Sequence, residues 1–210
     1  MKNLAKFCGI ILLAFMFTSC VDYVQSISYK DGNYHLYYKV TFSKLIFGLL
    51  DEDPEDLFED FDEDMIENLP DNVECNSINN DFEVGAEFSI DINPKTTDED
   101  ERDLLPKVSG NKCFIPFLLG ENNTTSDSFG SDDSMGEAIS QAIMSSAKCH
   151  IFIGKNLIPE IETANIEGLG ELNYIIPFYD YGDSFCLEIP FIVIMEDSFY
   201  KTDKIVIVKG

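Results

Sequence analysis

Cysteine is the residue type that offers this chain the widest chemistry, from disulfides and metal binding to lipid attachment. Beyond the first twenty residues, Cys75, Cys113, Cys149 and Cys186 follow one another at separations of 38, 36 and 37 residues. None of them forms the C-x-x-C pair of a zinc site, so we expect no metal at these thiols. Two disulfides, one disulfide and buried thiols without a bridge all fit this even number. Outside the cytoplasm, at least one bridge is favoured.

Groups suited to acid–base or nucleophilic catalysis are scarce. The histidines are His35 and His150, and no serine lies in a G-x-S-x-G nucleophile motif. His150 follows Cys149 directly, and neighbouring residues of a strand point to opposite faces, so the two do not form a dyad. Residues 168–170, Gly-Leu-Gly, lack the third glycine of a dinucleotide fingerprint. We therefore predict no catalytic residue, no cofactor and no enzymatic activity.

The densest run of charge, residues 51–67, holds eleven carboxylates and no basic residue. Asp53 is placed to cap a helix, and Pro54 to occupy its first position. Apolar residues recur in this run at spacings of three and four, which predicts an amphipathic helix over 54–67 with a solvated acidic face. The spacing of an EF-hand loop, with its central glycine, is absent, so we expect no metal in this run either.

The first twenty residues have the layout of a targeting segment. Lys2 and Lys6 form a short positive region, and eleven uncharged residues follow from Phe7 to Phe17. That run suits a signal peptide but is much shorter than the roughly 20 residues that span a bilayer. Small residues then lead to Cys20.

The ending Phe17-Thr18-Ser19-Cys20 resembles the lipobox of bacterial lipoproteins, of the spirochaete-like kind that tolerates phenylalanine where leucine is usual. The resemblance implies cleavage of a signal peptide, residues 1–19, with a diacylglycerol on the Cys20 thiol and an acyl chain on the new amine. We therefore expect a protein anchored to a cell membrane or outer membrane through lipid on Cys20. Its domain would face the periplasm or the cell surface, and two or three acyl chains would make the attachment effectively permanent.

The mature chain is strongly acidic. Without residues 1–19, which hold two lysines and no acid, it carries 12 basic and 39 acidic residues, a formal charge of −27. This balance excludes nucleic acid as a partner and argues against adhesion to anionic headgroups, because both need clustered lysine and arginine. With 45% hydrophobic residues, the chain has ample material for a folded core.

Alternation of apolar and polar residues dominates the mature chain. Residues 23–43 contain two such runs about Asp31-Gly32, a strong hairpin signal, and residues 82–92 alternate as cleanly. A second amphipathic helix is predicted over roughly 135–147. Further strands are predicted near 149–153, 158–166, 172–179, 185–195 and 204–209. The expected class is α+β, a mainly antiparallel β-sheet with two short amphipathic helices.

A polar stretch, residues 120–134, is the clearest linker or loop in the chain. It separates a β-rich half, residues 20–119, with the order hairpin, helix and strands, from residues 135–210, a helix followed by strands. The sequence leaves open whether these halves share one core. The tripeptide Ile-Pro-Phe occurs at 115–117, 176–178 and 189–191. Since proline cannot donate to a strand ladder, we expect these strands at sheet edges or bulged.

The order of elements in residues 23–92 resembles the LppM-type lipoprotein domain of mycobacterial envelopes. The matching pieces are the turn Asp31-Gly32, the stretch Asp53-Pro54-Glu55-Asp56-Leu57 and the pair Val84-Gly85. This resemblance implies an envelope protein that contacts lipid or glycolipid, with no catalytic residues.

The function expected from the sequence is that of a lipid-anchored cell-envelope protein with an acidic, non-catalytic binding or structural domain. An envelope protein, a lipid and a glycolipid remain open as its partner besides the membrane. The alternative is an envelope hydrolase with its site at strand ends. An enzyme should show a cleft with converging catalytic groups, whereas a binding module needs only a complementary surface.

Overall fold

The computed structural model corrects the expected fold class from α+β to β. Among the described residues, 66% lie in strands and 7% in helices, so a class with two amphipathic helices is wrong. Period-two alternation runs through most of these segments, which is the pattern of strands rather than of helices. The helices expected over 54–67 and over roughly 135–147, like the segments 1–20 and 120–134, lie outside the described residues, except for Ala147, which is not in a helix. The structure describes residues 21–50, 72–98, 102–117, 147–166, 174–194 and 205–209.

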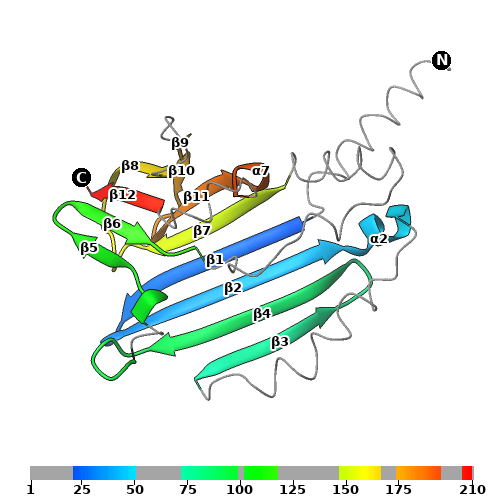
Figure 1. Cartoon of the computed structure of the whole chain (residues 1–210), viewed down its shortest axis with the longest axis horizontal. Coiled ribbons are helices and arrows are strands. Elements are labelled where there is room, and N and C mark those ends of the chain that lie inside the picture. The colour runs from blue at the N-terminus through cyan, green and yellow to red at the C-terminus, as the bar shows by residue number, and fades with distance from the viewer. Residues whose placement is uncertain are drawn as a thin grey trace.

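The larger sheet has seven strands in the order β10-β11-β7-β1-β2-β4-β3 (Figure 1). Their bounds are β1 (Val21–Lys30), β2 (Asn33–Ser43), β3 (Val73–Asn79), β4 (Glu83–Ile92), β7 (Lys148–Gly154), β10 (Phe178–Asp180) and β11 (Ser184–Pro190). The predicted hairpin is confirmed, because Lys30 pairs with Asn33 about a two-residue turn. In that turn Asp31 and Gly32 have φ angles of 54° and 92°, the left-handed values that a tight hairpin turn requires.

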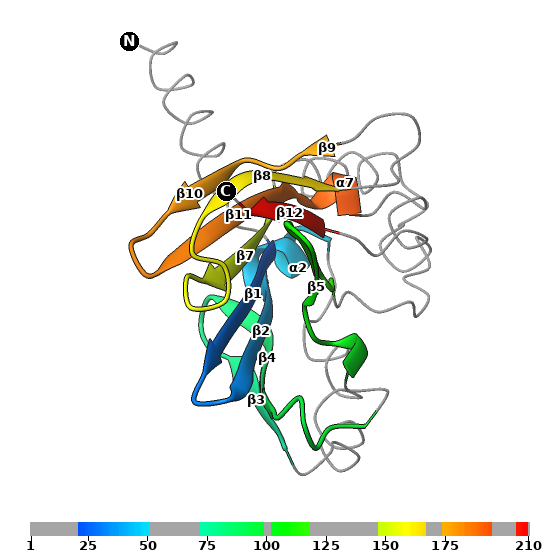
Figure 2. The ribbon, with the colours of Figure 1, turned by 90° about the vertical axis from the view of Figure 1, so that its left-hand side faces the viewer.

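The smaller sheet has five strands in the order β5-β6-β12-β8-β9. Their bounds are β5 (Lys107–Ser109), β6 (Lys112–Ile115), β8 (Ile161–Ile166), β9 (Tyr174–Ile175) and β12 (Ile205–Lys209). Figures 1 and 2 show this sheet over one side of the larger sheet, with β9 near β10 and with β5 and β6 near β1 and β2, whereas β3 lies at the far edge. One cluster of buried side chains fills the space between the sheets.

Both sheets combine strands from the two halves of the chain. In the larger sheet, β1 lies between β2 and β7, and its pairing with β7 is parallel. In the smaller sheet, β12 at the end of the chain lies between β6 and β8. The described strands of residues 21–117 and 147–209 therefore enclose a shared core.

The inner face of the larger sheet carries one buried amide, Gln25, beside apolar neighbours. Its Nε2 donates to the carbonyl of Pro116 at 2.8 Å, and its Oε1 accepts from the Tyr23 hydroxyl at 3.3 Å. Because Pro116 follows β6, this amide links the central strand of the larger sheet to the smaller one. A buried amide without such partners would be strongly destabilising, so the bonds account for its presence in the core.

Two short helices begin where strands end. The helix α2 (Lys44–Leu50) continues directly from β2, and α7 (Phe191–Ile194) continues from β11. The strand predicted for 185–195 therefore stops at Pro190. Register places both helices at the end of the sheet where β1 begins, since Val21 pairs with Phe42 and Asp22 pairs with Lys148, the partner of Pro190.

The Ile-Pro-Phe prolines lie at strand ends, and the expected edge position is confirmed for Pro177, which lies between the edge strands β9 and β10, but not for Pro116 and Pro190, which adjoin the interior strands β6 and β11. Pro116 follows β6, and Pro190 is the last residue of β11. Pro177 lies between β9 of the smaller sheet and β10 of the larger one. On either side of this crossing, the Ile176 amide donates to Ala164 and the Pro177 carbonyl accepts from Glu188. The missing proline N–H thus falls where the chain leaves one ladder for the other.

Candidate functional site

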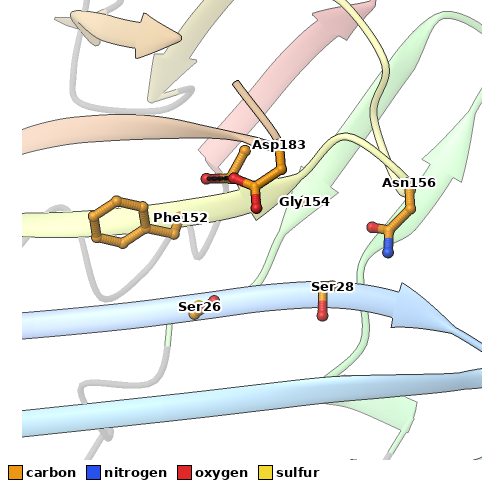
Figure 3. A pocket seen from close by; sticks show the side chains of 7 residues that line it. Ser26, Ser28, Phe152, Gly154, Asn156 and Asp183 are labelled. Carbon is orange, nitrogen blue, oxygen red and sulfur yellow. Dashed lines mark hydrogen bonds between the residues drawn. The ribbon is translucent and has the colours of Figure 1, made fainter. Parts of the chain in front are cut away.

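A hollow of about 400 Å³ opens on the outer face of the larger sheet (Figure 3). Ser26 and Ser28 of β1 form one side, because they alternate with the inward-facing Ile27. Phe152 and Gly154 of β7 lie beside them. The opposite wall comes from the loops that follow β7 and β10.

Gly154 keeps the floor of the hollow open. A Cβ atom at this position would lie 2.5 Å from Asn156 Oδ1 and 3.0 Å from Ser28 Cβ, closer than atoms normally approach. Asn156 is held across this gap, since its Oδ1 accepts a hydrogen bond from the Tyr29 amide at 3.3 Å. A side chain at position 154 would therefore fill the hollow and displace the asparagine.

The turn between β10 and β11 positions the carboxylate of Asp183. In this turn Gly182 has a φ of 91°, and its amide donates to Asp180 Oδ1 at 2.8 Å. The Asp183 carbonyl accepts from the Lys155 amide at 2.9 Å, which fixes the turn against the loop after β7. Lys155 Nζ lies 2.7 Å from Asp180 and lowers the pKa of that carboxyl, together with the Gly182 amide.

Several polar atoms that face the hollow have no protein partner among the described residues. They are the hydroxyls of Ser26 and Ser28 and the Nδ2 group of Asn156. Ser184 donates to Asp183 Oδ1 at 3.4 Å, which leaves acceptor capacity on the carboxylate. Converging polar groups that are unsatisfied within the protein are the usual means by which a site orients a ligand.

Aromatic rings border the hollow on the same face. The rings of Phe152 and Tyr181 meet edge to face with centroids 6.0 Å apart, and Tyr181 is 63% exposed. Tyr179 also lies on this face, since it pairs with Cys186, the partner of Phe152, and it is 48% exposed. The site thus combines hydroxyl, amide and carboxylate groups with an apolar ring surface.

A row of charged residues crosses the outer face beside the hollow. The His150 ring lies between two carboxylates, with Nδ1 3.9 Å from Asp22 and Nε2 3.8 Å from Glu188. His150, and then Lys39 at 3.9 Å, hold the pKa of Asp22 below its usual value, although partial burial opposes them. Glu188 also pairs with Lys148 at 2.9 Å. Lys39 beside Asp22, and Lys148 beside Glu188, place opposite charges side by side across the strands, which stabilises their pairing.

Both histidines lie on the outer face of the larger sheet beside carboxylates. His35 pairs with the carboxylate of Asp91, and both ring nitrogens of His150 face carboxylates rather than a serine or cysteine. As the sequence predicts, Cys149 faces the core while His150 lies on the outer face. A nucleophile and its base act within hydrogen-bond reach of each other. Register places Ser28 of β1 opposite His35 of β2, and no hydrogen bond joins these two described side chains.

The four later cysteines lie apart from one another and are not joined in disulfides. Cys186 pairs with Phe152 on the outer face of β7, whereas Cys149 is three positions away and faces inward. Two thiols on opposite faces of a sheet cannot bridge without movement of the backbone. Cys113 also faces the core, but it lies near Tyr34, about six residues along β1 and β2 from Cys149. At roughly 3.3 Å per residue this separation is about 20 Å.

The structure thus favours the alternative of thiols without a bridge over the expected disulfide. Burial raises the pKa of Cys113 and Cys186 to about 11, and raises that of Cys149 further. Since the thiolate is the reactive form, these three cysteines should be inert in the native fold. Cys75 lies on β3 and is only half-buried.

We expect alkylation without reductant to distinguish these alternatives. In the native state, Cys113, Cys149 and Cys186 should resist iodoacetamide, because they are buried and protonated. After unfolding in guanidinium chloride, mass spectrometry should find all four later cysteines labelled. If two of them stay unlabelled until a reductant is added, a disulfide is present and the arrangement described above is wrong.

Comparisons with protein-family models, with curated proteins and with solved structures gave no match for this chain. Within the described segments, no helix has the length and apolar character needed to cross a membrane. The same residues contain no group of three or more His, Cys, Asp or Glu side chains arranged to hold a metal ion.

Sequence reasoning did not find the hollow. Its residues come from β1, β7, the start of β11 and two loops, and the pairing of β7 with both β1 and β11 brings them together. A partial signal was available in the two serines that alternate with Ile27, and in the turn-forming run Asp180-Tyr181-Gly182-Asp183. The cysteines are the residue type with the widest chemistry in the sequence, but none of them lines this hollow.

Proposed function

We propose that this chain is a lipid-anchored cell-envelope protein whose acidic β domain binds a ligand without catalysing a reaction. The observation that carries the binding role is the hollow, in which unpartnered hydroxyl and amide groups converge beside aromatic rings. The anchoring role rests on the lipobox-like ending at Cys20. The strand β1 begins at Val21, so the lipid would be attached directly to the central strand of the larger sheet.

The hollow lies at the other end of that strand. Ser28 lies seven positions along β1 from Val21, which at roughly 3.3 Å per position is about 23 Å. Gly154 and Ser184, which pair with each other, lie at the same end as Ser28. With Cys20 at the membrane, the hollow would face away from the lipid, where ligands of the envelope can reach it.

The groups that line the hollow suit a neutral, polyhydroxylated ligand such as the sugar part of an envelope glycan or glycolipid. Serine hydroxyls and the Asn156 amide can exchange hydrogen bonds with sugar hydroxyls, and the Asp183 carboxylate can accept them. Phe152 offers an apolar ring to the carbon face of a sugar. The lining contains no lysine or arginine, and Lys155 nearby is paired with Asp180, so an anionic ligand would meet uncompensated repulsion from Asp183.

Saccharide titrations test this proposal. A panel of neutral hexoses and N-acetylhexosamines should give saturation-transfer NMR signals with the native chain. The double variant Ser26→Ala/Ser28→Ala should bind the strongest of them about tenfold more weakly, since two hydrogen bonds of about 0.5–1.5 kcal/mol each are lost. Ser77→Ala is the matched control, because Ser77 is exposed on β3 at the far edge of the same sheet.

Two results would contradict the proposal. The first is that no saccharide of the panel binds the native chain. The second is that the double variant and Ser77→Ala bind as well as the native chain, which would place binding elsewhere. Unchanged thermal unfolding of both variants would show that weaker binding reflects the lost hydroxyls rather than a loss of fold.

A further inference from the structure

We infer that Leu45 and Phe82 form a rim that inserts into the membrane interface beside the lipid anchor. This rim is defined by those two side chains, and its assignment rests on the proposed acylation of Cys20. It gives the domain a second, apolar contact with the bilayer, and so a fixed orientation with the hollow away from the lipid.

Strand register places the rim at the start of β1. Val21 pairs with Phe42, and Phe42 pairs with Val84. Phe82 precedes this row by two residues, and its carbonyl accepts a hydrogen bond from the Lys44 amide at 2.9 Å. Leu45 is the next residue of α2. Both apolar side chains therefore lie within a few residues of the point where the chain enters the sheet.

Both side chains are held outward by local structure. Asn80 Oδ1 accepts hydrogen bonds from the amides of Phe82 and Glu83 at 2.9 and 3.0 Å, which fixes the turn between β3 and β4. Phe82 is 80% exposed in this turn, and Leu45 is 48% exposed. The helix α2 is anchored by Phe47, which is buried and packs on Phe42 with ring centroids 6.4 Å apart. These hydrogen bonds and this packing therefore hold the two rim side chains at the surface.

We assign the bilayer as the partner of the rim because the proposed lipid on Cys20 lies directly before β1. One residue extends at most about 3.6 Å, so a lipid on Cys20 places Val21 at the membrane surface. Amphipathic structures that lie at this surface bury their apolar side chains about 5–10 Å into the boundary between headgroups and acyl chains. A rim beside Val21 is within that reach. A protein partner or a second copy would have to compete with lipid that is already present.

The rim should prefer uncharged lipid. Its neighbouring base, Lys44, has its Nζ 2.6 Å from Asn79 Oδ1, and the acidic run 51–67 begins directly after α2 in the sequence. A mature chain with a charge of −27 is repelled by anionic headgroups. The contact is therefore apolar, and phosphatidylcholine vesicles are the appropriate probe.

The chain contains no tryptophan, which allows a direct test. The substitutions Phe82→Trp, Leu45→Trp and Tyr181→Trp, made singly in the full acylated protein, each introduce one tryptophan fluorophore at an exposed position. Tyr181 is the matched control, because it lies beside the hollow at the opposite end of the sheet. The proteins are reconstituted into phosphatidylcholine vesicles with and without bromine on the acyl chains.

Emission from the Phe82→Trp and Leu45→Trp proteins should shift to shorter wavelength and be quenched by brominated lipid. Emission from Tyr181→Trp should show neither effect. If the proteins float with the vesicles and no quenching occurs at positions 45 and 82, the rim does not enter lipid, although the anchor holds. If the chain is not acylated and does not float, both the anchor and the rim are wrong. Unchanged thermal unfolding of the three variants confirms their fold.

Discussion

The substitution Cys20→Ser should transfer the protein completely from the membrane to the soluble phase. The lipobox resemblance assigns the thiol of Cys20 as the atom that receives diacylglycerol, and a serine hydroxyl would not replace it. Acyl chains contribute about 0.8 kcal/mol for each buried CH₂ group, so the loss of two or three chains removes nearly all of the membrane affinity. The rim of Leu45 and Phe82 is too small to retain the protein by itself.

Detergent phase separation with mass spectrometry of the product measures this effect. The native chain should enter the detergent phase and carry the mass of a cleaved, acylated protein. Cys8→Ser is the matched control, because Cys8 lies in the segment that the lipobox assigns to the cleaved signal peptide. Equal partitioning of the native chain and Cys20→Ser would rule out the lipid anchor, and with it the proposed location.

Gly85→Ala should destabilise the domain more than a typical substitution. Gly85 is buried in β4 and pairs with Thr41 of β2. A Cβ atom at position 85 would overlap the Val40 carbonyl oxygen and lie 2.8 Å from Thr41 Cα. Both are backbone atoms of the neighbouring strand, so relief requires the β2–β4 ladder to separate. Overpacking usually costs about 1–3 kcal/mol, and we expect a loss of at least about 3 kcal/mol.

Urea unfolding measures this loss against Gly48→Ala. Gly48 lies in α2, where an added Cβ meets no atom within 4 Å. Alanine there should leave the free energy of unfolding unchanged or raise it by up to about 1 kcal/mol, because alanine favours helices. Similar stability of the two variants would mean that β2 and β4 do not approach as closely as described. The close approach of β2 also explains, without any ligand, why a glycine follows Val84 at position 85.

Local sequence determined which face of each strand is buried. Alternation at Leu36 and Tyr38, and at Ala86 and Ile92, predicted the inward sides of β2 and β4, and these residues lie in the core. The hairpin at Asp31 followed from its turn chemistry in the same way. Such features depend on residues two to four positions apart, which the sequence presents directly.

The expected α+β class was wrong for the described part of the chain, which is mostly β-sheet. That class rested on helices over 54–67 and 135–147, which apart from Ala147 lie outside the described residues, whereas α2 and α7 are short helices at the ends of strands. Pro190 ends β11 where continuous alternation suggested a longer strand. Apolar runs at strand ends fit a short helix and a strand equally well, so their state depends on what they pack against.

Only the tertiary structure decided which strands are neighbours. The parallel pairing of β1 with β7 unites residues more than 120 positions apart, and it creates both the shared core and the hollow. The register of β7 with β11 places Cys149 and Cys186 on opposite faces of the sheet, against the expectation of a bridge between them. Alternation fixes the face of a residue but not its partner strand, because many apolar strands could fill the same place in a sheet. The sequence therefore determined where the chain is expected to be attached, and long-range strand pairing decided where the proposed binding site lies.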